Sequence, residues 1–309
     1  MIDKGRTVLT ILLYSYEKEG NSLFKALSSI NNQVGCNLKG KLRILLLINN
    51  KNVNQQINFA FFENLNIDLF IRKNKNYATL VNEALKTIHT EWVTFMDSRD
   101  LLFADGSLLD FFSLSNDPKN RTDILIFKYL IPNINNDQII DFTAIDYLNF
   151  PFGKYFKLSF LQNNSIFFNE QLKHYLLEDF TSRAVEICKK PIWVNLINYY
   201  LTPRTSGKDD LNEFVRYRLT FLDFIQKNNV TGQTYLRDLA WSIVRAFYIL
   251  EDQDLFNILT DKRDFLSLVN LVRPFNNYKD KLIDEFKQQR GSHKMGFSQF
   301  EDFLRGNKE

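Results

Sequence analysis

The feature that most constrains the fold is an alternation of apolar runs and amphipathic stretches in the first third of the chain. Four runs rich in β-branched and other apolar residues, at 8–14, 42–48, 67–72 and 92–96, predict strands. Helical spacing of apolar residues predicts helices at 21–30, with Asn21 as the cap, and at 77–88, and residues 54–65 can form another helix. This alternation predicts an α/β fold with a mostly parallel sheet and helices on both faces.

The remaining sequence continues the sheet and then changes character. Strands are expected at 123–130, 138–142 and 192–201, with a turn at 133–137, a strand and short helix over 154–161, and a helix at 176–189. From 211 onwards the pattern is helical, with helices expected at 236–250, 264–272 and 278–286. The turn-forming, basic stretch 202–209 (TPRTSGKD) separates the two parts. We therefore predict two domains, 1–208 and 209–309.

Composition excludes several classes of protein. The formal charge is 39 − 36 = +3, too small to indicate nucleic acid as a partner. The two cysteines rule out a disulfide framework, and no Cys/His cluster has the spacing of a zinc site. No run approaches the roughly 20 apolar residues that cross a bilayer. We expect a cytoplasmic protein, with peripheral contact at the inner face of the membrane left open.

Polar clusters follow each of the first four expected strands. They come after Tyr14, Ile48, Arg72 and Met96. Ligands of open α/β sheets bind at the carboxyl ends of the strands. These clusters are therefore the expected binding edge.

Seven segments in order carry a family resemblance. They are 9–17 (LTILLYSYE), 43–52, 74–84 (NKNYATLVNEA), 92–100 (WVTFMDSRD), 153–170 (GKYFKLSFLQNNSIFFNE), Glu178-Asp179-Phe180 and 199–206 (YYLTPRTS). Together they resemble the motifs of the large inverting family 2 of glycosyltransferases, which have the GT-A fold. The resemblance covers 8–207 and implies an α/β nucleotide-sugar-binding domain, followed here by a helical C-terminal region.

The resemblance implies a UDP-sugar donor and assigns residues to it. Tyr16 stands where the family has an aromatic residue that stacks on the base, a task suited to any π-face. Asn49 and Asn50 replace two aspartates; an Asn side chain accepts hydrogen bonds but brings no charge. Tyr14 and Arg72, at the ends of their strands, are further donor-binding candidates.

The stretch Asp97-Ser98-Arg99-Asp100 resembles the family's D-x-D motif, with Arg99 in place of the second carboxylate. Mg²⁺ and Mn²⁺ need oxygen ligands, which a guanidinium does not offer. Three interpretations stay open: Arg99 neutralises the diphosphate directly; Asp100, with Asp97, binds a metal; or donor binding has been lost.

The resemblance makes Asp179 the general base that takes a proton from the acceptor hydroxyl, with Glu178 as the fallback. Residues 175–177 and Phe180 could partly bury its carboxyl group and make it a better proton acceptor. An acidic pair at a helix start also has a purely structural explanation in the helix dipole.

The segment after the last expected strand carries the remaining candidates. Arg204, Ser206 and Lys208 correspond to a stretch that often covers the donor phosphates in the family, and basic residues there suit a lid over an anion. A solvated linker explains them nearly as well.

Two functions are therefore weighed. The first is an inverting transferase acting on a surface glycan, a teichoic-acid-like polymer or a glycoprotein. The second is a catalytically silent GT-A-like subunit that binds an acceptor or a partner glycosyltransferase, which the departures at Tyr14, Asn49, Asn50 and Arg99 favour. A nucleotidyltransferase is weaker, because the first turn lacks a Gly-rich, basic loop. Exposed parts of the C-terminal aromatic stripes would suit a homo-oligomer contact, an acceptor platform or a membrane surface.

Overall fold

The computed structural model describes residues 7–15, 20–49, 58–73, 75–135, 138–145, 149–202, 210–230, 233–252, 278–289 and 296–305, with Ser267 and Asn270. The chain forms two compact units. The first comprises Met1–Glu170 and Phe180–Thr205, and the second Gln171–Asp179 and Ser206–Glu309.

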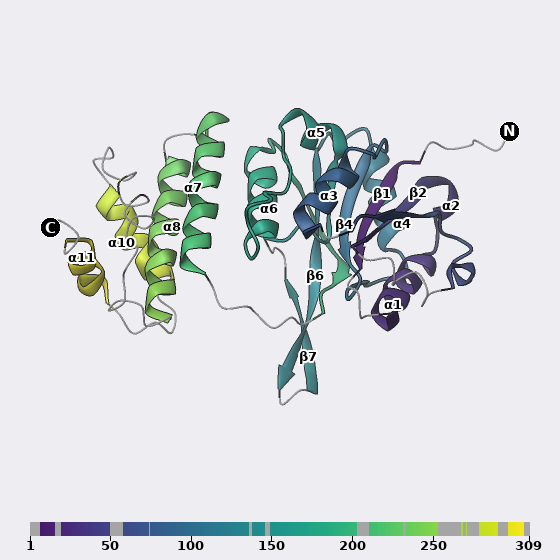
Figure 1. Cartoon of the computed structure of the whole chain (residues 1–309), viewed down its shortest axis with the longest axis horizontal. Coiled ribbons are helices and arrows are strands. Elements are labelled where there is room, and N and C mark those ends of the chain that lie inside the picture. Colours follow the sequence, from purple (N-terminus) through teal and green to yellow (C-terminus); the bar gives the residue numbers. More distant parts are fainter. Residues whose placement is uncertain are drawn as a thin grey trace. The chain divides into compact units, whose positions relative to one another are not determined.

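Four parallel strands form one half of the sheet in the first unit, in the order β3-β2-β1-β4 (Figure 1). Their bounds are β1 Leu9–Ser15, β2 Leu42–Ile48, β3 Ile67–Ile71 and β4 Trp92–Asp97. Nearly every residue of β1 and β2 is buried, as continuous apolar runs require. The predicted strands and the α/β fold class are confirmed.

Helices pack on both faces of this sheet. Trp92 packs on Phe111 of α4 (Ser107–Asn116), with ring centroids 5.7 Å apart. Phe95 packs on Phe180 of α6 (Leu176–Ile187), with centroids 5.2 Å apart. Because side chains alternate along a strand, residues three apart point to opposite faces. The other helices of this unit are α1 Gly20–Asn31, α2 Leu38–Lys41, α3 Tyr77–Leu85 and α5 Leu158–Asn163.

The other half of the sheet is mixed. It continues from β4 in the order β8-β6-β9-β5, and β7 pairs with β6 off this path. β8 is antiparallel to both β4 and β6, whereas β6 and β9 are parallel. The bounds are β5 Leu101–Leu102, β6 Ile124–Asn135, β7 Gln138–Ile145, β8 Lys154–Lys157 and β9 Ile192–Tyr200.

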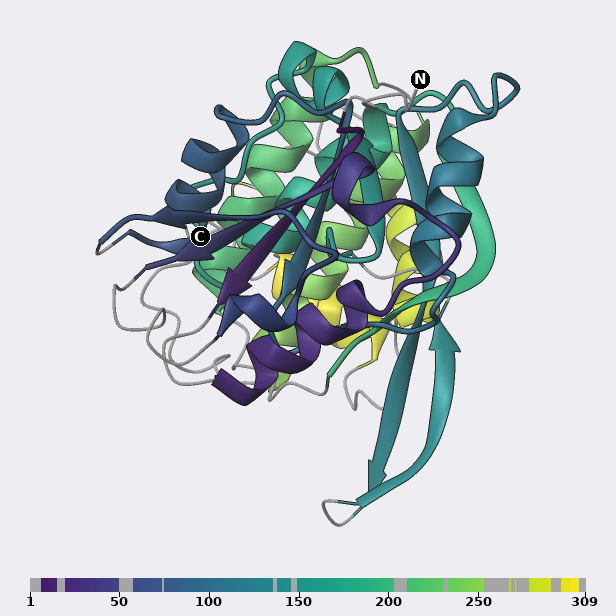
Figure 2. The same cartoon turned by 90° about the vertical axis from the view of Figure 1, so that its right-hand side faces the viewer.

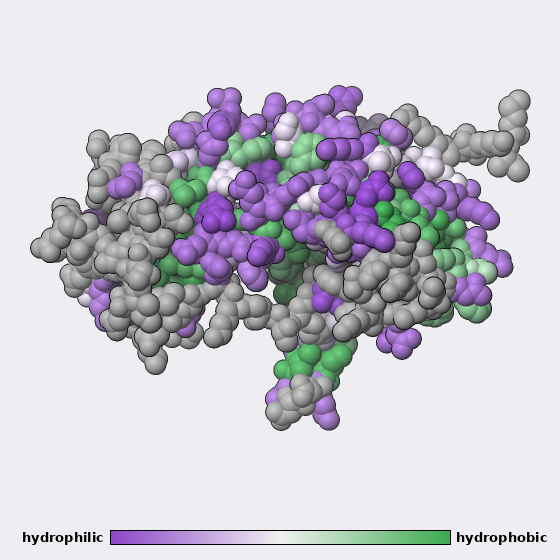
Figure 3. Space-filling model, viewed as in Figure 1, coloured by the Kyte–Doolittle hydropathy of each residue, from purple (hydrophilic) through white to green (hydrophobic). Residues whose placement is uncertain are grey.

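The predicted hairpin is confirmed and is longer than its sequence suggested. β6 and β7 extend away from the rest of the sheet (Figure 2). Ile139, Ile140 and Phe142 are 52%, 64% and 52% exposed, and the hairpin carries an apolar patch (Figure 3). Because the hairpin extends beyond the sheet, nearly every residue of β7 is exposed. The strand therefore has no alternation of buried and exposed residues that its sequence could show.

The helix expected at 21–30 is confirmed but its predicted cap is wrong, and the helix expected at 54–65 is wrong in its described part. α1 begins at Gly20, so Asn21 lies inside the first turn and does not cap it; Asn21 is exposed there, and the helix is fixed by its buried apolar stripe. Of the helix expected at 54–65, the described part contains only the 3₁₀ turn η2, Phe59–Phe61. Asn58 accepts the Ala60 N–H (3.1 Å) and starts this short turn, after which Phe62 is buried.

The second unit is helical. Its helices are α7 Leu211–Lys227, α8 Gln233–Asp252, α10 Tyr278–Gln289 and α11 Phe297–Arg305. They share one apolar core that includes Phe214, Phe221, Phe247 and Phe286. Of the helix expected at 264–272, most residues lie outside the described part of the chain. Among the described helices, none is both long and apolar enough to span a bilayer.

Candidate functional site at the carboxyl edge of the sheet

The carboxyl ends of β1 and β4 lie side by side, because the two strands pair in parallel with Tyr14 opposite Asp97. The Tyr14 carbonyl accepts the N–H of Ser98 at 2.9 Å, which ties the turn after β4 to β1. The half-buried Tyr14 ring packs edge-on against Tyr77, the first residue of α3, with centroids 4.9 Å apart. Tyr14 therefore helps to place the start of α3 beside this edge.

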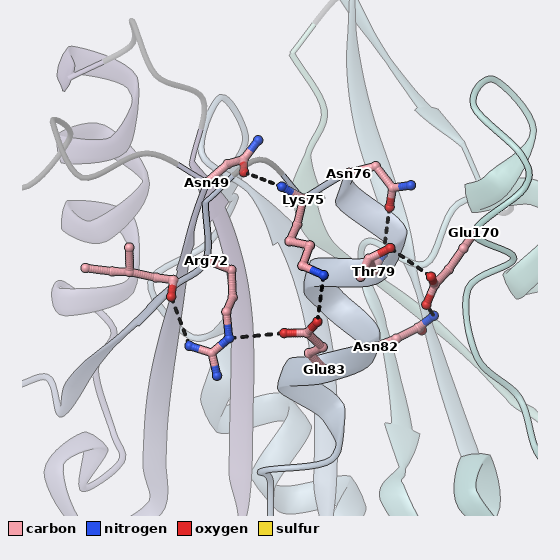
Figure 4. Close-up of polar contacts among 9 residues, drawn as sticks. Asn49, Arg72, Lys75, Asn76, Thr79, Asn82, Glu83 and Glu170 are labelled. Carbon is pink, nitrogen blue, oxygen red and sulfur yellow. Dashed lines mark hydrogen bonds and ion pairs between the residues drawn. The ribbon is translucent and has the colours of Figure 1, made fainter.

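Asn49 joins the end of β2 to the start of α3 (Figure 4). Its side-chain oxygen accepts the N–H of Lys75 at 2.9 Å. The next residue, Asn76, caps α3 by accepting the Thr79 N–H at 2.8 Å. The neutral amide oxygen of Asn49 thus holds the loop that leads into α3.

Arg72 lies along the flank of α3 rather than pointing into open space (Figure 4). Its Nε donates to Glu83 at 3.1 Å, and its Nη1 donates to the Ile71 carbonyl at 2.9 Å. The guanidinium also lies 4.1 Å from the centre of the Phe70 ring. Lys75 approaches the same carboxylate of Glu83 at 3.6 Å.

Glu170 is a residue of this edge that the sequence placed only within a motif. Its carboxylate accepts hydrogen bonds from Thr79 (2.8 Å) and Asn82 (3.1 Å), both on α3 (Figure 4). These bonds, that from Asn82 first, hold the pKa of the Glu170 carboxyl below its usual value. Asn82 also exchanges two hydrogen bonds with the backbone of Phe168. The Asn-x-Ile-x-Phe-x-Glu ending therefore anchors α3.

Asp97 and Arg99 form a two-pronged ion pair. Asp97 is 3% exposed, and its two oxygens accept from Nε and Nη2 of Arg99 at 2.9 and 2.8 Å. One of them also accepts the Arg99 N–H at 3.0 Å. The Arg99 side chain remains 29% exposed. The guanidinium thus neutralises Asp97, while the Arg99 side chain stays partly exposed.

Asp100 holds the end of β9 in place. It is fully buried; one oxygen accepts from the Tyr199 hydroxyl at 2.8 Å and the other from the Thr202 N–H at 2.9 Å. The Tyr199 hydroxyl also accepts the Asp97 N–H at 3.3 Å. Burial, and then the charges of Asp100 and Asp97, raise the pKa of Tyr199 well above its usual value. Neither Tyr199 nor Thr202 could be assigned a role from the sequence, because they lie about a hundred positions from Asp100.

A buried lysine lies in the strand beside β4. Lys154 donates to the Tyr129 hydroxyl at 2.5 Å and to the Phe150 carbonyl at 2.6 Å. Burial lowers the pKa of Lys154 well below its usual value. The preceding Gly153 has φ +63°, and a Cβ there would lie 3.1 Å from the Tyr129 ring and 3.2 Å from Tyr199. Only glycine fits between the Tyr129 ring and the Cβ of Tyr199 without strain.

A divalent metal at this edge would meet carboxylates that already accept hydrogen bonds within the protein. The described residues contain no group of three His, Cys, Asp or Glu side chains placed to hold one. Both Asp97 oxygens accept from a guanidinium, and both Asp100 oxygens accept from protein donors. A hard cation would have to displace these bonds.

The acidic pair lies at the start of α6, in the part that belongs to the second unit. Asp179 is fully buried and Glu178 partly exposed, and the Asp179 N–H donates to the Tyr175 carbonyl at 2.9 Å. The next residue, Phe180, belongs to the first unit, where it stacks on Phe168 at 4.2 Å.

Five of the candidate residues lie outside the described residues: Tyr16, Asn50, Arg204, Ser206 and Lys208. The structure brings together Tyr14, Asp97, Arg99 and Asp100 around the turn after β4. It also places Asn49 and Arg72 at the neighbouring ends of β2 and β3, where the Arg72 N–H donates to the Ile48 carbonyl at 3.0 Å.

No protein-family profile and no curated protein sequence matches this chain. Solved structures do match it. Residues 1–349 of TarS from S. aureus, in complex with UDP-GlcNAc, align with a TM-score of 0.66 and 18% identity, over 91% of this chain and 89% of that one. Against the longer TarS structure, with a TM-score of 0.65 and 18% identity, the alignment covers 94% of this chain and 56% of that one.

A second matching protein comes from an archaeon. The mannosyltransferase PcManGT from Pyrobaculum calidifontis, in complex with GDP-Man and Mn²⁺, aligns with a TM-score of 0.52 and 12% identity, over 94% of this chain and 88% of that one. At these identities the likeness concerns the fold. The chain has the fold of the GT-A glycosyltransferases, as its sequence motifs predicted.

Proposed function

We propose that the chain is a glycosyltransferase that moves a sugar from a nucleoside diphosphate, UDP, to a hydroxyl of a glycan or glycoprotein acceptor. The observation that carries this proposal is the turn after β4, where Asp97 and Arg99 lie at the carboxyl edge of a GT-A sheet. Ligands of open α/β sheets bind at this edge. The likeness to TarS, whose structure holds UDP-GlcNAc, supports UDP as the nucleotide.

Arg99 is proposed to neutralise the diphosphate without a metal. Its side chain is partly exposed, and the planar guanidinium fits phosphate oxygens. The carboxylate oxygens of Asp97 and Asp100 already accept hydrogen bonds from protein groups, so a metal would have to compete with those groups for its ligands. Tyr16 would stack on the base, while Arg204, Ser206 and Lys208 would cover the phosphates.

Transfer with inversion needs a base on the acceptor side. In the proposed step, Asp179 takes the proton of the acceptor hydroxyl, and the oxygen bonds to the anomeric carbon. The bond from that carbon to the diphosphate breaks, and UDP leaves with the electron pair. Glu178 is the alternative base. A surface glycan, a teichoic-acid-like polymer or a glycoprotein would be the acceptor, at the cytoplasmic side of a membrane. A homo-oligomer through the C-terminal helices is part of the same proposal.

The alternative is a silent subunit that binds an acceptor or a partner glycosyltransferase. Two observations favour it: Arg99 already donates to both oxygens of Asp97, and the Asn49 amide oxygen already accepts the Lys75 N–H. Side chains expected on the donor are thus engaged within the protein.

Calorimetric titration with UDP, with and without Mn²⁺, distinguishes these functions. We expect UDP to bind equally well in both conditions. The Arg99→Ala variant should bind about 10- to 100-fold more weakly, the loss expected for a hydrogen bond to a charged group. Arg43→Ala is the matched control, because Arg43 is also 29% exposed and ion-paired, with Asp68, but lies at the amino end of β2.

Each other result has a defined meaning. Binding that strengthens with Mn²⁺ would contradict the metal-free role of Arg99 and favour Asp97 or Asp100 as a ligand. Absence of binding to both UDP and GDP would favour the silent subunit. Release of UDP from UDP-GlcNAc, or from other UDP-sugars, then tests catalysis itself.

A further inference from the structure

The segment before α6 is built into the helical unit. Residues 171–179 belong with α7 and the helices after it, not with the sheet that precedes them in sequence. Leu172 is 3% exposed within the helical core. Tyr175 packs against Phe214, with centroids 5.4 Å apart, and stacks on Tyr217 at 5.7 Å and 13°. This segment carries Glu178 and Asp179 at its end.

One carboxylate fixes the backbone of this segment. Glu213 accepts the N–H of both Lys173 and His174, the latter at 2.6 Å. Glu213 is 8% exposed, and hydrogen bonds to a charged acceptor are among the stronger ones in proteins. The imidazole of His174 lies 3.9 Å from the other oxygen. One side chain of α7 thus holds two successive backbone groups of the segment.

Glu213 is itself held firmly. It lies in the first turn of α7, where its own N–H donates to the capping side chain of Asp210 at 3.0 Å. The next residue, Phe214, is the one against which Tyr175 packs. The Glu213 carboxylate therefore projects from the capped start of α7, and the next side chain, Phe214, is buried in the helical core.

The connection continues to the acidic pair. Tyr175 directly follows the two residues that Glu213 holds, and its carbonyl accepts the Asp179 N–H at 2.9 Å, one helical turn further along. We infer that Glu213 is a positioning residue, which sets the start of α6 and thereby the direction of the Asp179 carboxylate. This inference rests on the proposed function, in which Asp179 is the base.

The physical reason is a loss of backbone partners. Without the Glu213 carboxylate, two N–H groups lose a charged acceptor, and the segment must turn them towards water to satisfy them. That reorientation changes where α6 begins. A misplacement of about 1 Å of a catalytic group can lower a rate about 100-fold.

The test compares Glu213→Ala and Glu213→Gln with Glu285→Ala in the full-length protein. Glu285 is a matched control: it lies in the same unit, is 9% exposed and accepts a side-chain hydrogen bond from Gln289 at 2.8 Å. Amide hydrogen exchange is followed in peptides covering 171–180. UDP affinity, and the kcat and KM for UDP release from UDP-GlcNAc, are measured in parallel.

Glu213→Ala should exchange at least tenfold faster in 171–180 and lose at least tenfold in kcat, with UDP affinity and donor KM within about twofold of the parent. Glu213→Gln keeps a carbonyl acceptor and should recover most of the rate. Glu285→Ala should keep kcat within about twofold. A merely structural role would not produce this separation of kcat from KM or the rescue by Gln.

Two outcomes overturn the inference. In one, exchange in 171–180 is unchanged in Glu213→Ala. In the other, exchange rises but kcat is that of the parent, so that the segment moves without affecting the chemistry. Failure of the proposed function looks different: the parent protein itself binds neither UDP nor GDP and releases no UDP.

Discussion

Removal of one hydroxyl, in Tyr199→Phe, tests whether the turn after β4 depends on its buried network. The hydroxyl donates to Asp100 at 2.8 Å and accepts the Asp97 N–H at 3.3 Å. The ring itself stacks on Phe152 with centroids 6.0 Å apart, and phenylalanine preserves this contact. The substitution therefore removes two hydrogen bonds and almost no apolar packing.

The expected cost follows from these two bonds. A hydrogen bond to a charged group contributes about 1.5–3 kcal/mol. The Asp97 N–H bond is long, so its loss should cost about 1 kcal/mol. Asp100 keeps its bond from the Thr202 N–H. We expect Tyr199→Phe to lower the free energy of unfolding by about 3 kcal/mol, which corresponds to roughly 6–12 °C in Tm for a domain of this size.

Urea unfolding and thermal melts measure this loss, with Tyr200→Phe as the matched control. Tyr200 is the next residue and is partly exposed beside Phe142, so its variant should lose less than about 0.5 kcal/mol. Equal stabilities of the two variants would refute the reasoning, because the buried Tyr199 hydroxyl would then contribute no more to stability than the Tyr200 hydroxyl.

The pH dependence provides an independent check. The folded chain raises the pKa of Tyr199, so above the unfolded value of about 10 the unfolded state binds fewer protons than the folded state. Folding stability should therefore fall as the pH rises above about 10. In Tyr199→Phe this contribution is absent, and the alkaline loss should be smaller than in the parent.

Three further predictions concern neighbouring residues. Gly153→Ala should lower the free energy of unfolding by about 2 kcal/mol or more, because the site has positive φ and the Tyr129 ring lies within 3.1 Å of the added Cβ; urea unfolding measures this, and a neutral effect would contradict it. Lys154 has a lowered pKa, so the unfolded state binds more protons and the parent should gain stability relative to Lys154→Met as the pH rises from 7 towards about 10; parallel unfolding curves lacking this divergence would show that Lys154 is charged in the fold. Arg99→Lys should keep part of the UDP affinity that Arg99→Ala loses, since it retains the charge but not the fork; calorimetry giving equal losses would show that geometry alone matters.

The sequence predicted the sheet because its strands are short apolar runs, which have few alternatives in a chain of this composition. The same rule located the carboxyl edge, where Tyr14 and Asp97 indeed lie opposite each other. It failed at 54–65, where apolar spacing alone could not reveal that Asn58 starts a short 3₁₀ turn. Turn chemistry at a single residue overrode the periodicity there.

The roles of the polar residues were harder to predict, because they depend on partners distant in sequence. Asp100 was a candidate metal ligand, but its oxygens accept from Tyr199 and Thr202. Likewise, Glu213 lies about forty positions from the backbone that it holds, within a stretch that had only a helical pattern. Periodicity reports which face of an element is buried, and it carries no information about such pairings.

The contacts of Asp97 and Asp100 lead to one argument about how an anion would be held. Arg99 already pairs with Asp97, so Arg99 alone does not offset the charges of a diphosphate. A diphosphate at this edge would therefore need further cations. The sequence offers Arg204 and Lys208, which follow Thr202 within a few residues, and Asp100 fixes the Thr202 N–H. On the proposed function, Asp100 acts by fixing Thr202, the residue after which the basic segment starts. This role differs from that of a metal ligand in a D-x-D motif.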